Sequence, residues 1–335
     1  MRGLYRNVLG TPFENTEKTL HISLIETKQV WHQIILDELN GEKIRKSISN
    51  ELSDLKEKIR NFSDRQIIYF ISRRPRVRLY KPIKYSFFGN TITIPIEIGE
   101  NRKRRKLRCN LSYLDSTGKK HRPSISSTSK LVRLGIGDST LDFPISIFLQ
   151  EFGIDLGICS EITYIGRTDD PKRRVIDGNH RGLSDTLSMS LDSGDDVFVH
   201  FNLFHARYHS EIPEKGIHFL ASNSLLDYVE IKEEAEIIEK LFINYFRPST
   251  QSGSKSTDST RLKKSVSRLN SNKNVKSIIV SCELNNSAHD FNFFTPSISP
   301  RKGHIFQCEL IDKTNLSFTT LEKDPIEKLY NSSDI

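Results

Sequence analysis

The segment ITYIGRTDDPKRR, residues 162–174, joins a short β-prone run to a polar turn and two adjacent arginines. Side chains along a strand have a period of two residues, so Ile162, Tyr164 and Gly166 are predicted to share one face. A glycine at such a position has no side chain, which lets a backbone or a phosphate approach closely. The segment therefore predicts a strand that presents a tyrosine beside an accessible stretch of backbone.

The polar residues after this strand predict a turn and then a helix. Asp169-Asp170-Pro171 is typical of a turn, and proline is favoured at the first position of a helix. Arg173 and Arg174 would then lie in the first turns of that helix. Such an arrangement can direct a phenol and a guanidinium at one phosphodiester.

The whole chain has the composition of a folded protein with an anionic partner. Its 335 residues predict two or three domains, because a single core stops growing at roughly 300 residues. Hydrophobic residues make up 36% and charged residues 27%, which is near the globular average, so most of the chain should fold. The net charge of +8 favours a polyanion such as nucleic acid as the partner.

Cysteine usage and hydropathy indicate the compartment. The four cysteines lie far apart and form no CxxC pair, which removes the strongest signature of a zinc or redox site. No run approaches the roughly eighteen apolar residues of a membrane helix, and the first residues lack the apolar core of a secretion signal. We expect a reduced, cytoplasmic protein with no membrane partner.

Residues 1–140 predict an N-terminal α+β domain. Apolar residues recur at helical spacing from Asn15 to Asn40 and again from Ile44 to Phe62, which predicts a helical hairpin. The period then changes to that of strands in QIIYFIS, TITIPIEI and LRCNLSYL. A helical hairpin leading into a β-rich basic region is the expected layout.

Three basic clusters in this region predict contacts with nucleic acid. They are RRPRVR (73–78), RKRRKLR (102–108) and KKHR (119–122), and any one of them alone is equally consistent with a solvated loop. Together they would supply the phosphate contacts that dominate nucleic-acid affinity without specifying sequence. The candidate nucleic-acid-binding residues are Arg73, Arg74, Arg76, Arg102, Lys103, Arg104, Arg105, Arg167 and Arg173.

Two further segments complete the domain prediction. Residues 251–275 are rich in Ser, Lys and Thr with few bulky apolar residues, which predicts a mobile basic linker or loop. The segments VKSIIVSCEL and GHIFQCELI then predict strands of a β-rich C-terminal extension over residues 276–335.

The segment EIIEKLFINYFRPSTQ, residues 236–251, predicts a helix on which two glutamates have different neighbouring side chains. On a helical face Glu239 neighbours apolar side chains, whereas Glu236 neighbours charged ones. A carboxylate beside the core is costly unless it is paired or binds a metal. Glu239 is therefore a candidate metal ligand, with a simple salt bridge as the alternative.

These residues together resemble the GIY-YIG endonucleases. Tyr164-Ile165-Gly166 is similar to the second half of the family's name. Arg174 is the eighth residue after Gly166, where the family usually keeps its catalytic arginine, and Arg173 is the fallback. Glu239 precedes Pro248 by nine positions, as the family's glutamate does. The resemblance covers about residues 144–251.

The sequence departs from the family pattern in its first motif, Gly-Ile-Tyr, which is not evident. Gly157-Ile158-Cys159 lacks the tyrosine, and Phe148, in the strand candidate ISIFL, would supply a ring without a hydroxyl. Gln251 stands where the family usually places an asparagine, although a longer amide can still donate a hydrogen bond.

The resemblance implies an α+β fold and a hydrolytic mechanism. Residues 141–250 would form a GIY-YIG-like domain, a small antiparallel sheet flanked by helices, that hydrolyses phosphodiesters with one Mg²⁺ (or Mn²⁺) held by Glu239. Tyr164 would orient or deprotonate the attacking water, and Arg174 would neutralise the transition state. His180, in the loop after the arginines, would carry a proton.

The sequence therefore predicts a metal-dependent endonuclease acting on DNA, of the restriction or antiviral defence kind. The alternative is a catalytically inactive nucleic-acid-binding or scaffold protein that uses a degenerate nuclease fold, because the first family tyrosine is missing. RNA remains open as the substrate. Cutting both strands with one site per chain would favour a homodimer or a higher homo-oligomer.

Overall fold

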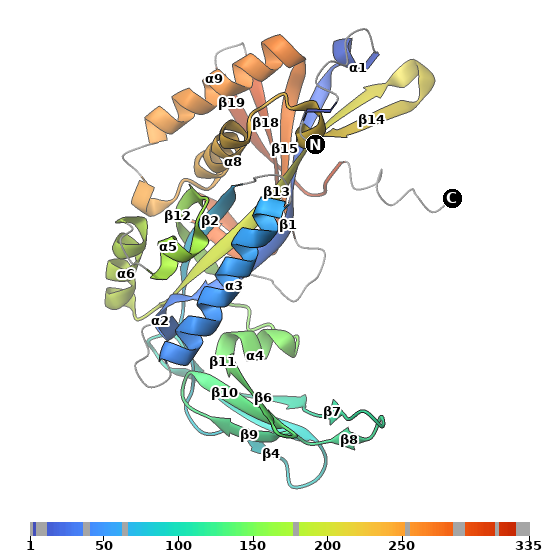
Figure 1. Ribbon diagram of the computed structural model, residues 1–335. Coiled ribbons are helices and arrows are strands. Elements are labelled where there is room, and N and C mark those ends of the chain that lie inside the picture. The colour runs from blue at the N-terminus through green and yellow to red at the C-terminus, as the bar shows by residue number, and fades with distance from the viewer. Residues whose placement is uncertain are drawn as a thin grey trace.

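We describe the fold from a computed structural model of the chain. The structure describes residues 3–4, 12–35, 41–61, 66–176, 181–251, 255–283, 292–311 and 315–325. Its main body is one large curled sheet with helices on both faces, and a smaller β-rich region lies at one end (Figure 1).

The main sheet has ten strands and is mixed. At its centre β2 (Ile67–Arg74) pairs antiparallel with β12 (Ser160–Thr168) on one side and with β13 (Asp196–Ile212) on the other. Next to β13 the order continues with β1 (Lys18–Trp31), β15 (Val275–Cys282), β18 (His304–Ile311) and β19 (Asn315–Leu321), of which β15 runs parallel to β1. The remaining strands are β16 (Phe293–Thr295) and β17 (Ile298–Arg301) beyond β12, and β14 (Ile217–Ser222) beside β13.

The predicted fold, a small antiparallel sheet flanked by helices, is wrong for this chain. The strands β12, β2 and β13 are antiparallel, but they form the middle of a sheet that draws strands from both ends of the sequence. The C-terminal strands extend this sheet because a sheet edge presents unpaired backbone groups that another strand satisfies. The chain is therefore organised around one large sheet.

The predicted N-terminal helical hairpin is also wrong, since its first helix is mostly strand β1. A bulge between Leu24 and Glu26 shifts the register of this strand against β13. Leu20 and Ile22 precede the bulge and enter the core on one face of the sheet, whereas Val30 follows it and enters the core on the other face. Apolar residues that change face in this way mimic helical spacing. The second predicted helix is α3 (Gly41–Asn61).

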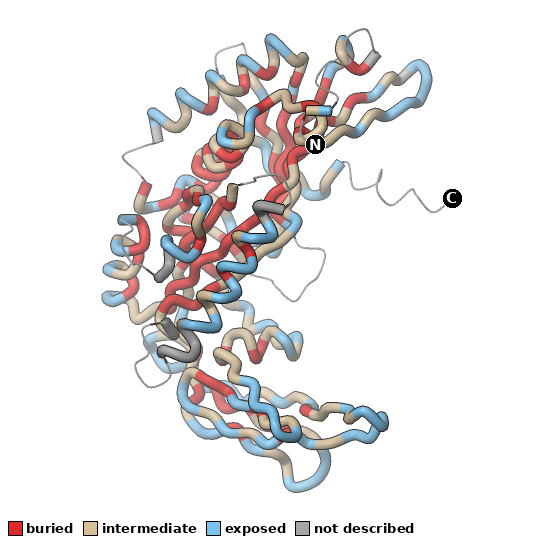
Figure 2. Tube along the Cα trace, in the orientation of Figure 1, coloured by how far each residue is buried: buried red, intermediate tan, exposed pale blue. Residues whose placement is uncertain are grey.

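Helices cover both faces of the sheet. On one face α8 (Ile231–Phe246) and α9 (Lys255–Lys273) bury apolar side chains in the larger core. On the other face α3 and α6 (Arg181–Ser193) pack over a second core that includes Leu55 and Leu183. Figure 2 shows the buried residues following the strands of the sheet. The remaining helical segments are α1 (Pro12–Asn15), α2 (His32–Ile35), α5 (Pro171–Ile176), α7 (Asn223–Leu226), η1 (Pro213–Lys215) and η2 (Ser249–Gln251).

Helix α9 occupies most of the segment that composition suggested as a mobile linker. Its Leu262, Val266 and Leu269 are buried, and they recur at helical spacing among polar residues. Three apolar side chains are enough to dock this polar segment against the core, which low average hydrophobicity does not reveal.

A separate domain is inserted between β2 and β12, and we call residues 75–159 the inserted domain. It contains a hydrophobic core of its own, built from residues 77–149. Its sheets and helix are β3 (Val77–Leu79), β4 (Lys84–Tyr85), β5 (Thr91–Ile98), β6 (Lys103–Asn110), β7 (Tyr113–Leu114), β8 (Lys120–His121), β9 (Ser124–Ser127), β10 (Leu131–Ile136), β11 (Ser139–Pro144) and α4 (Ile145–Glu151). Figure 1 shows it at the end of the molecule opposite α9.

None of the helices in the described ranges is both long enough and apolar enough for a membrane crossing.

Candidate active site

The strand β12 carries the Tyr-Ile-Gly triplet and contains a bulge at Thr163. Its pairing with β2 shifts register there, because Ile162 faces Ser72 while Tyr164 faces Ile71. The Thr163 hydroxyl holds the bulge by donating to the Ile71 carbonyl at 3.1 Å, and it also lies 2.7 Å from the Thr186 hydroxyl of α6. The extra residue reverses the alternation of side chains along the strand.

As a result, the prediction that Ile162 shares a face with Tyr164 and Gly166 is wrong. Ile162 and Ile165 lie in the larger core beneath α8. Tyr164 packs against the second core beneath α6. Gly166 faces the same way as Tyr164, since a Cβ built on Gly166 would meet the Tyr164 ring at 2.9 Å.

The two strands bring a second tyrosine, Tyr69, to this glycine. Tyr69 lies directly opposite Gly166 in the register of β2 and β12. The rings of Tyr69 and Tyr164 stack with their centroids 6.0 Å apart at an interplanar angle of 26°. A Cβ on Gly166 would lie 2.5 Å from the Tyr69 hydroxyl oxygen, closer than real side chains allow. Glycine at position 166 is therefore what lets Tyr69 occupy this place.

Gly182, at the start of α6, closes the other side of Tyr164. A Cβ at this position would be 2.3 Å from the Tyr164 ring. The absence of a side chain on α6 at this point lets the helix pack directly on the phenol ring. Tyr164 is thereby held between a strand and a helix and stays half-buried.

The far edge of β12 is held by the residues that follow α8. The helix α8 ends at Phe246, and the next residue, Arg247, caps it with φ 54° and is followed by Pro248, which cannot continue a helix. The chain then turns so that the buried Gln251 amide donates to the Ile165 carbonyl at 2.7 Å and accepts from the Ile165 N–H at 2.9 Å. Thr250 adds a hydrogen bond to the Thr163 carbonyl at 2.6 Å. Side chains thus replace a neighbouring strand along the Tyr-Ile-Gly segment.

Glu239 lies on α8 beside the end of this segment. Its side chain is 18% exposed, and its Oε2 is 3.4 Å from Nε of Arg167, the residue after Gly166. The Arg167 guanidinium also donates to the Lys232 carbonyl at 2.9 Å. The structure therefore brings together two of the residues that the sequence selected, Glu239 and Arg167.

The charges around Glu239 include a buried lysine. Lys240 contacts the Glu236 carboxylate one turn earlier on α8, and burial lowers the pKa of Lys240 to about 8. Glu236 lies 3.8 Å from Arg167 and is less buried than Glu239. The environment of the two glutamates thus differs in burial, as their helical neighbours suggested.

The arginines of α5 follow the predicted turn. The helix begins at Pro171, and the Asp170 carboxylate accepts a hydrogen bond from the Arg173 N–H at 3.3 Å. The hydrogen bond from Lys56 lowers the pKa of Asp170, which keeps this carboxylate charged. Arg173 is exposed, and Arg174 belongs to α5, although its side chain lies outside the described part of the structure. His180 lies outside the described residues.

The first basic cluster is engaged with the protein itself. Arg73 pairs with Glu161 at 2.8 Å, and the Arg74 guanidinium lies 4.1 Å from the centre of the Phe198 ring. Burial lowers the pKa of Arg74 to about 10. Arg76 is half-buried near Gly194. The second cluster differs, because Arg102, Lys103, Arg104 and Arg105 are exposed at the turn into β6 and along that strand.

Sequence reasoning missed Tyr69 and placed an aromatic ring elsewhere. Phe148, the candidate for the missing motif, lies in helix α4 and in the core of the inserted domain. The segment QIIYFIS, which contains Tyr69, was recognisable as a strand that carries a tyrosine. Its signal was lost because the inserted domain separates it from Tyr164 along the chain.

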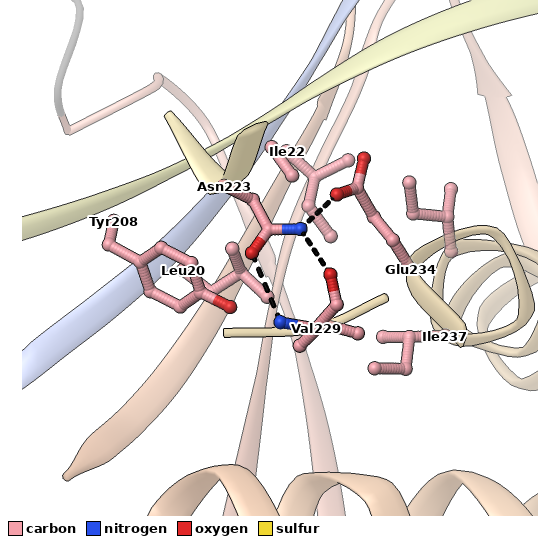
Figure 3. A pocket seen from close by; sticks show the side chains of 9 residues that line it. Leu20, Ile22, Tyr208, Asn223, Val229, Glu234 and Ile237 are labelled. Carbon is pink, nitrogen blue, oxygen red and sulfur yellow. Dashed lines mark hydrogen bonds between the residues drawn. The ribbon is translucent and has the colours of Figure 1, made fainter. Parts of the chain in front are cut away.

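A small cavity elsewhere does not add to this site (Figure 3). Mainly apolar residues of β1, β13 and α8 line it, and the Asn223 amide spans its polar side by donating to the Val229 carbonyl at 2.9 Å and to Glu234. Because the Asn223 amide has its hydrogen-bond partners within the protein, we interpret the cavity as an incompletely filled part of the larger core.

The carboxylate of Glu239 is chemically suited to be a ligand of Mg²⁺. Mg²⁺ commonly takes one or two carboxylates and keeps several waters, so one hard oxygen donor with partial exposure is sufficient. Within the described ranges, no group of three or more His, Cys, Asp or Glu side chains is arranged to hold a metal.

Comparisons with known proteins leave the chain without an assigned family. It matches no protein-family model, and no curated protein or solved structure shows significant similarity to it.

Proposed function

We propose that this chain is a metal-dependent endonuclease that hydrolyses DNA phosphodiesters at a site of the GIY-YIG kind. The observation that carries the proposal is the tyrosine pair, because Tyr69 lies opposite Gly166 and stacks on Tyr164. The family resemblance requires a second tyrosine on the strand beside the Tyr-Ile-Gly strand. Tyr69 lies on such a strand, in Ile67-Ile68-Tyr69, where an isoleucine stands in place of the glycine of the family's first motif.

Two further features support the same proposal. Gln251 contacts the Tyr-Ile-Gly backbone through its side-chain amide, which suits the place where the family keeps an asparagine. The helix that carries Glu239 packs against β12, and Glu239 pairs with the residue after Gly166.

The proposed site lies at the end of β12, whose two faces carry different candidate residues. Tyr164 and Arg167 leave the backbone three positions apart, about 10 Å along an extended strand. They emerge on opposite faces, with the tyrosines on one face and the Arg167–Glu239 pair on the other. The proposal therefore requires a phosphodiester bound at this end of the strand, before α5 begins, to be contacted by side chains from both faces.

Each candidate residue of the site has a proposed role. Tyr164 positions the attacking water and would need a pKa below the ordinary value near 10 to act as a base, with the buried Tyr69 stacked against its ring. Arg174, on the first helix after the strand, neutralises charge on the phosphorus in the transition state. His180 is the proposed proton carrier to the leaving oxygen. Glu239 would hold Mg²⁺ or Mn²⁺, which when bound stabilises charge on the scissile phosphate.

The biological setting follows the same proposal. A cytoplasmic restriction or antiviral nuclease suits a basic chain that carries an additional domain next to its site. Cleavage of both strands with one site per chain would need a second copy, so a homodimer is part of the proposal.

The second candidate function is a nucleic-acid-binding protein without nuclease activity. The observation that favours it is the Arg167–Glu239 contact, because a guanidinium at 3.4 Å competes with a metal for the same carboxylate. Under this alternative the salt bridge stabilises a degenerate site, and the chain binds DNA without cutting it.

Digestion of plasmid DNA by Glu239→Gln distinguishes the two. Plasmids with and without modified bases are incubated with the protein and Mg²⁺ or Mn²⁺, and EDTA replaces the metal in the control reaction. We expect cleavage by the unchanged chain and at least ~100-fold less by Glu239→Gln, because a catalytic metal contributes several kcal/mol to the transition state. DNA binding should persist in the variant.

The matched control is Glu233→Gln on the same helix, where the carboxylate contacts Arg268 of α9. This variant should cleave like the unchanged chain. Undiminished cleavage by Glu239→Gln would refute the proposed site, and metal-independent binding with no cleavage of any plasmid would favour the second candidate.

A further inference from the structure

The inserted domain is anchored to the main sheet as an arm. It leaves the sheet after β2 and returns at β12, and most of its buried apolar residues form a core of their own, whereas Leu131 joins the second core of the main sheet. At its base the Arg78 guanidinium makes two hydrogen bonds of 2.7 Å to the Asp196 carboxylate of β13, and it lies 5.0 Å from the Trp31 ring. Charge-assisted bidentate pairing of this kind fixes orientation as well as distance.

The outer face of this domain carries a row of cations along β6. Leu107 and Cys109 pack against the domain core, so the alternation of the strand turns Arg104, Lys106 and Arg108 outward. All three are exposed. We call them the β6 cation row.

The neighbouring strands add little negative charge to this row. In the register of β5 and β6, Lys106 and Arg108 lie opposite Pro95 and Thr93. Arg104 lies opposite Glu97, with 3.9 Å between Arg104 Nε and a Glu97 carboxylate oxygen. The face is therefore positive over most of its length.

The spacing of the row suits a nucleic-acid backbone. Alternate residues of a strand lie about 6.6 Å apart, which is close to the separation of successive phosphates along one nucleic-acid strand. Lysine and arginine contacts to phosphates release counterions, so they supply affinity that falls as salt rises.

Two phenylalanines are exposed at the end of this row. Phe87 and Phe88 form the β4–β5 turn with side chains 91% and 83% exposed, and their rings contact each other with centroids 4.9 Å apart. Gly89, with φ 78°, completes the turn. Thr91 pairs with Asn110, so the turn lies at the end of the sheet towards which the β6 cation row runs.

Two exposed phenyl rings are suited to bind a partner with flat apolar faces. Tyr85, two residues earlier, packs against the domain core, whereas Phe87 and Phe88 project beyond it. Leaving two phenyl rings in water forgoes the gain of burying them. In a nucleic-acid strand each base has flat apolar faces and is linked through its sugar to the phosphate backbone, so exposed aromatic rings beside a row of cations are complementary to such a strand.

We propose that the inserted domain binds DNA that contains unpaired bases. The β6 cation row follows the phosphates of one strand, and Phe87 and Phe88 stack on its bases. Opening a duplex step costs about as much free energy as one base–aromatic contact returns, so stacking at this turn selects bases that are already unpaired. Binding by this surface stands by itself, whereas its role in choosing the DNA to be cut rests on the proposed nuclease function.

The test measures binding by the full chain in EDTA, so that no cleavage takes part. Fluorescence anisotropy is recorded with a labelled single-stranded oligonucleotide, the same oligonucleotide in a duplex, and the duplex with an internal unpaired bubble. We expect single-stranded and bubble DNA to bind at least ~5-fold more tightly than the duplex, the least that one stacked base provides.

Two variants separate stacking from charge. The double substitution Phe87→Ser with Phe88→Ser should abolish the preference for unpaired bases and leave duplex binding unchanged. The triple substitution Arg104→Ala, Lys106→Ala and Arg108→Ala should weaken binding to all three DNAs and reduce the slope of log affinity against log salt by roughly 2 to 3.

Matched controls remove similar groups from the opposite end of the molecule. Ile217→Ser with Leu220→Ser removes two exposed apolar side chains of β14, and Arg261→Ala, Lys264→Ala and Lys276→Ala removes three cations. We expect the first control to leave the preference for unpaired bases intact. The second should weaken binding less than loss of the β6 cation row does.

Equal affinity of the unchanged chain for single-stranded and duplex DNA would overturn the proposal. So would an undiminished preference for unpaired bases in the serine variant, or equal effects of the two charge variants on binding. A variant with Phe87→Trp and Phe88→Trp guards against misfolding of the serine variant. It should keep the preference, because tryptophan also stacks on bases, and its loss would equally overturn the proposal. Failure of cleavage alone would leave these binding results as they are.

Discussion

The centre of the main sheet and the outer face of the inserted domain place polar groups in opposite surroundings. Around β12 the polar groups are buried and held by short contacts, as Gln251 holds Ile165. Along β6 the cations are exposed, and the domain core beneath them is small. A group that must reach one atom of a substrate benefits from fixed geometry, whereas a surface that attracts a polyanion needs mainly charge. The difference fits a reacting centre joined to a binding arm.

The largest expected effect at the centre is loss of the Gln251 amide. Gln251→Leu leaves the Ile165 N–H and carbonyl without their partner in a buried setting, at a cost of about 1–3 kcal/mol for each group. We expect the free energy of unfolding in urea to fall by roughly 2–5 kcal/mol.

The matched control for Gln251 is Gln307→Leu. The Gln307 amide donates to the carboxylate of Glu309, an exposed side chain two residues along the same strand, so water can replace this hydrogen bond. This substitution should change the unfolding free energy by less than about 0.5 kcal/mol. Equal effects of the two substitutions would mean that the edge of β12 is no more rigid than the surface.

A smaller effect is expected when the space above Gly166 is filled. The Cβ of Gly166→Ala would meet the Tyr69 hydroxyl at 2.5 Å and the Tyr164 ring at 2.9 Å, and Tyr69 is almost fully buried. Overpacking of this kind typically costs about 1–3 kcal/mol. We expect that loss in urea denaturation, together with a fall in any cleavage activity.

Gly303→Ala is the comparison for Gly166. Its Cβ would meet Glu283, an exposed side chain that can move away. The unfolding free energy should therefore change little. A loss at Gly166 no greater than that at Gly303 would show that the tyrosine pair is not tightly packed.

The smallest effect is a pH dependence from His304, beneath α8. Its ring contacts the Tyr245 hydroxyl at 3.2 Å and the Phe293 carbonyl at 2.9 Å. Burial lowers the pKa of His304 to about 4 from 6.5, so between these values the unfolded chain binds a proton that the folded chain refuses. Stability contributed by the neutral ring is present above about pH 6.5 and is lost as the pH falls towards 4.

His304→Gln removes this titration and keeps a polar group at the position. From pH 6.5 to 5.5 the unchanged chain should lose up to about 1 kcal/mol more unfolding free energy than the variant does. Identical pH profiles for the two proteins would contradict a neutral, buried His304.

Local patterns were informative where an element depends on neighbours in the sequence. The strand at Tyr164 and the helix beginning at Pro171 were both predictable, because β-prone residues and a proline act locally. The helix carrying Glu239 was predictable for the same reason, and so was the apolar surface beside it. The facing of Ile162 was not, since the bulge at Thr163 reverses the alternation.

Long-range pairing limited what the pattern could show. The region around Val30 looked helical because a bulge moved apolar residues from one core to the other. Tyr69 and Gly166 are opposite each other through strand pairing that spans an entire inserted domain. Neither feature can be recognised from a short window of consecutive residues in the sequence.

The sequence by itself determined the residue types at the candidate site: a tyrosine and glycine on a strand, arginines at the start of a helix, and a glutamate beside apolar neighbours. Only the tertiary structure decided which tyrosine accompanies Tyr164, which cations face outward and which are engaged with the protein. The physical reason is that spacing along the chain governs one strand or helix, whereas partners across a sheet depend on contacts between residues distant in the sequence.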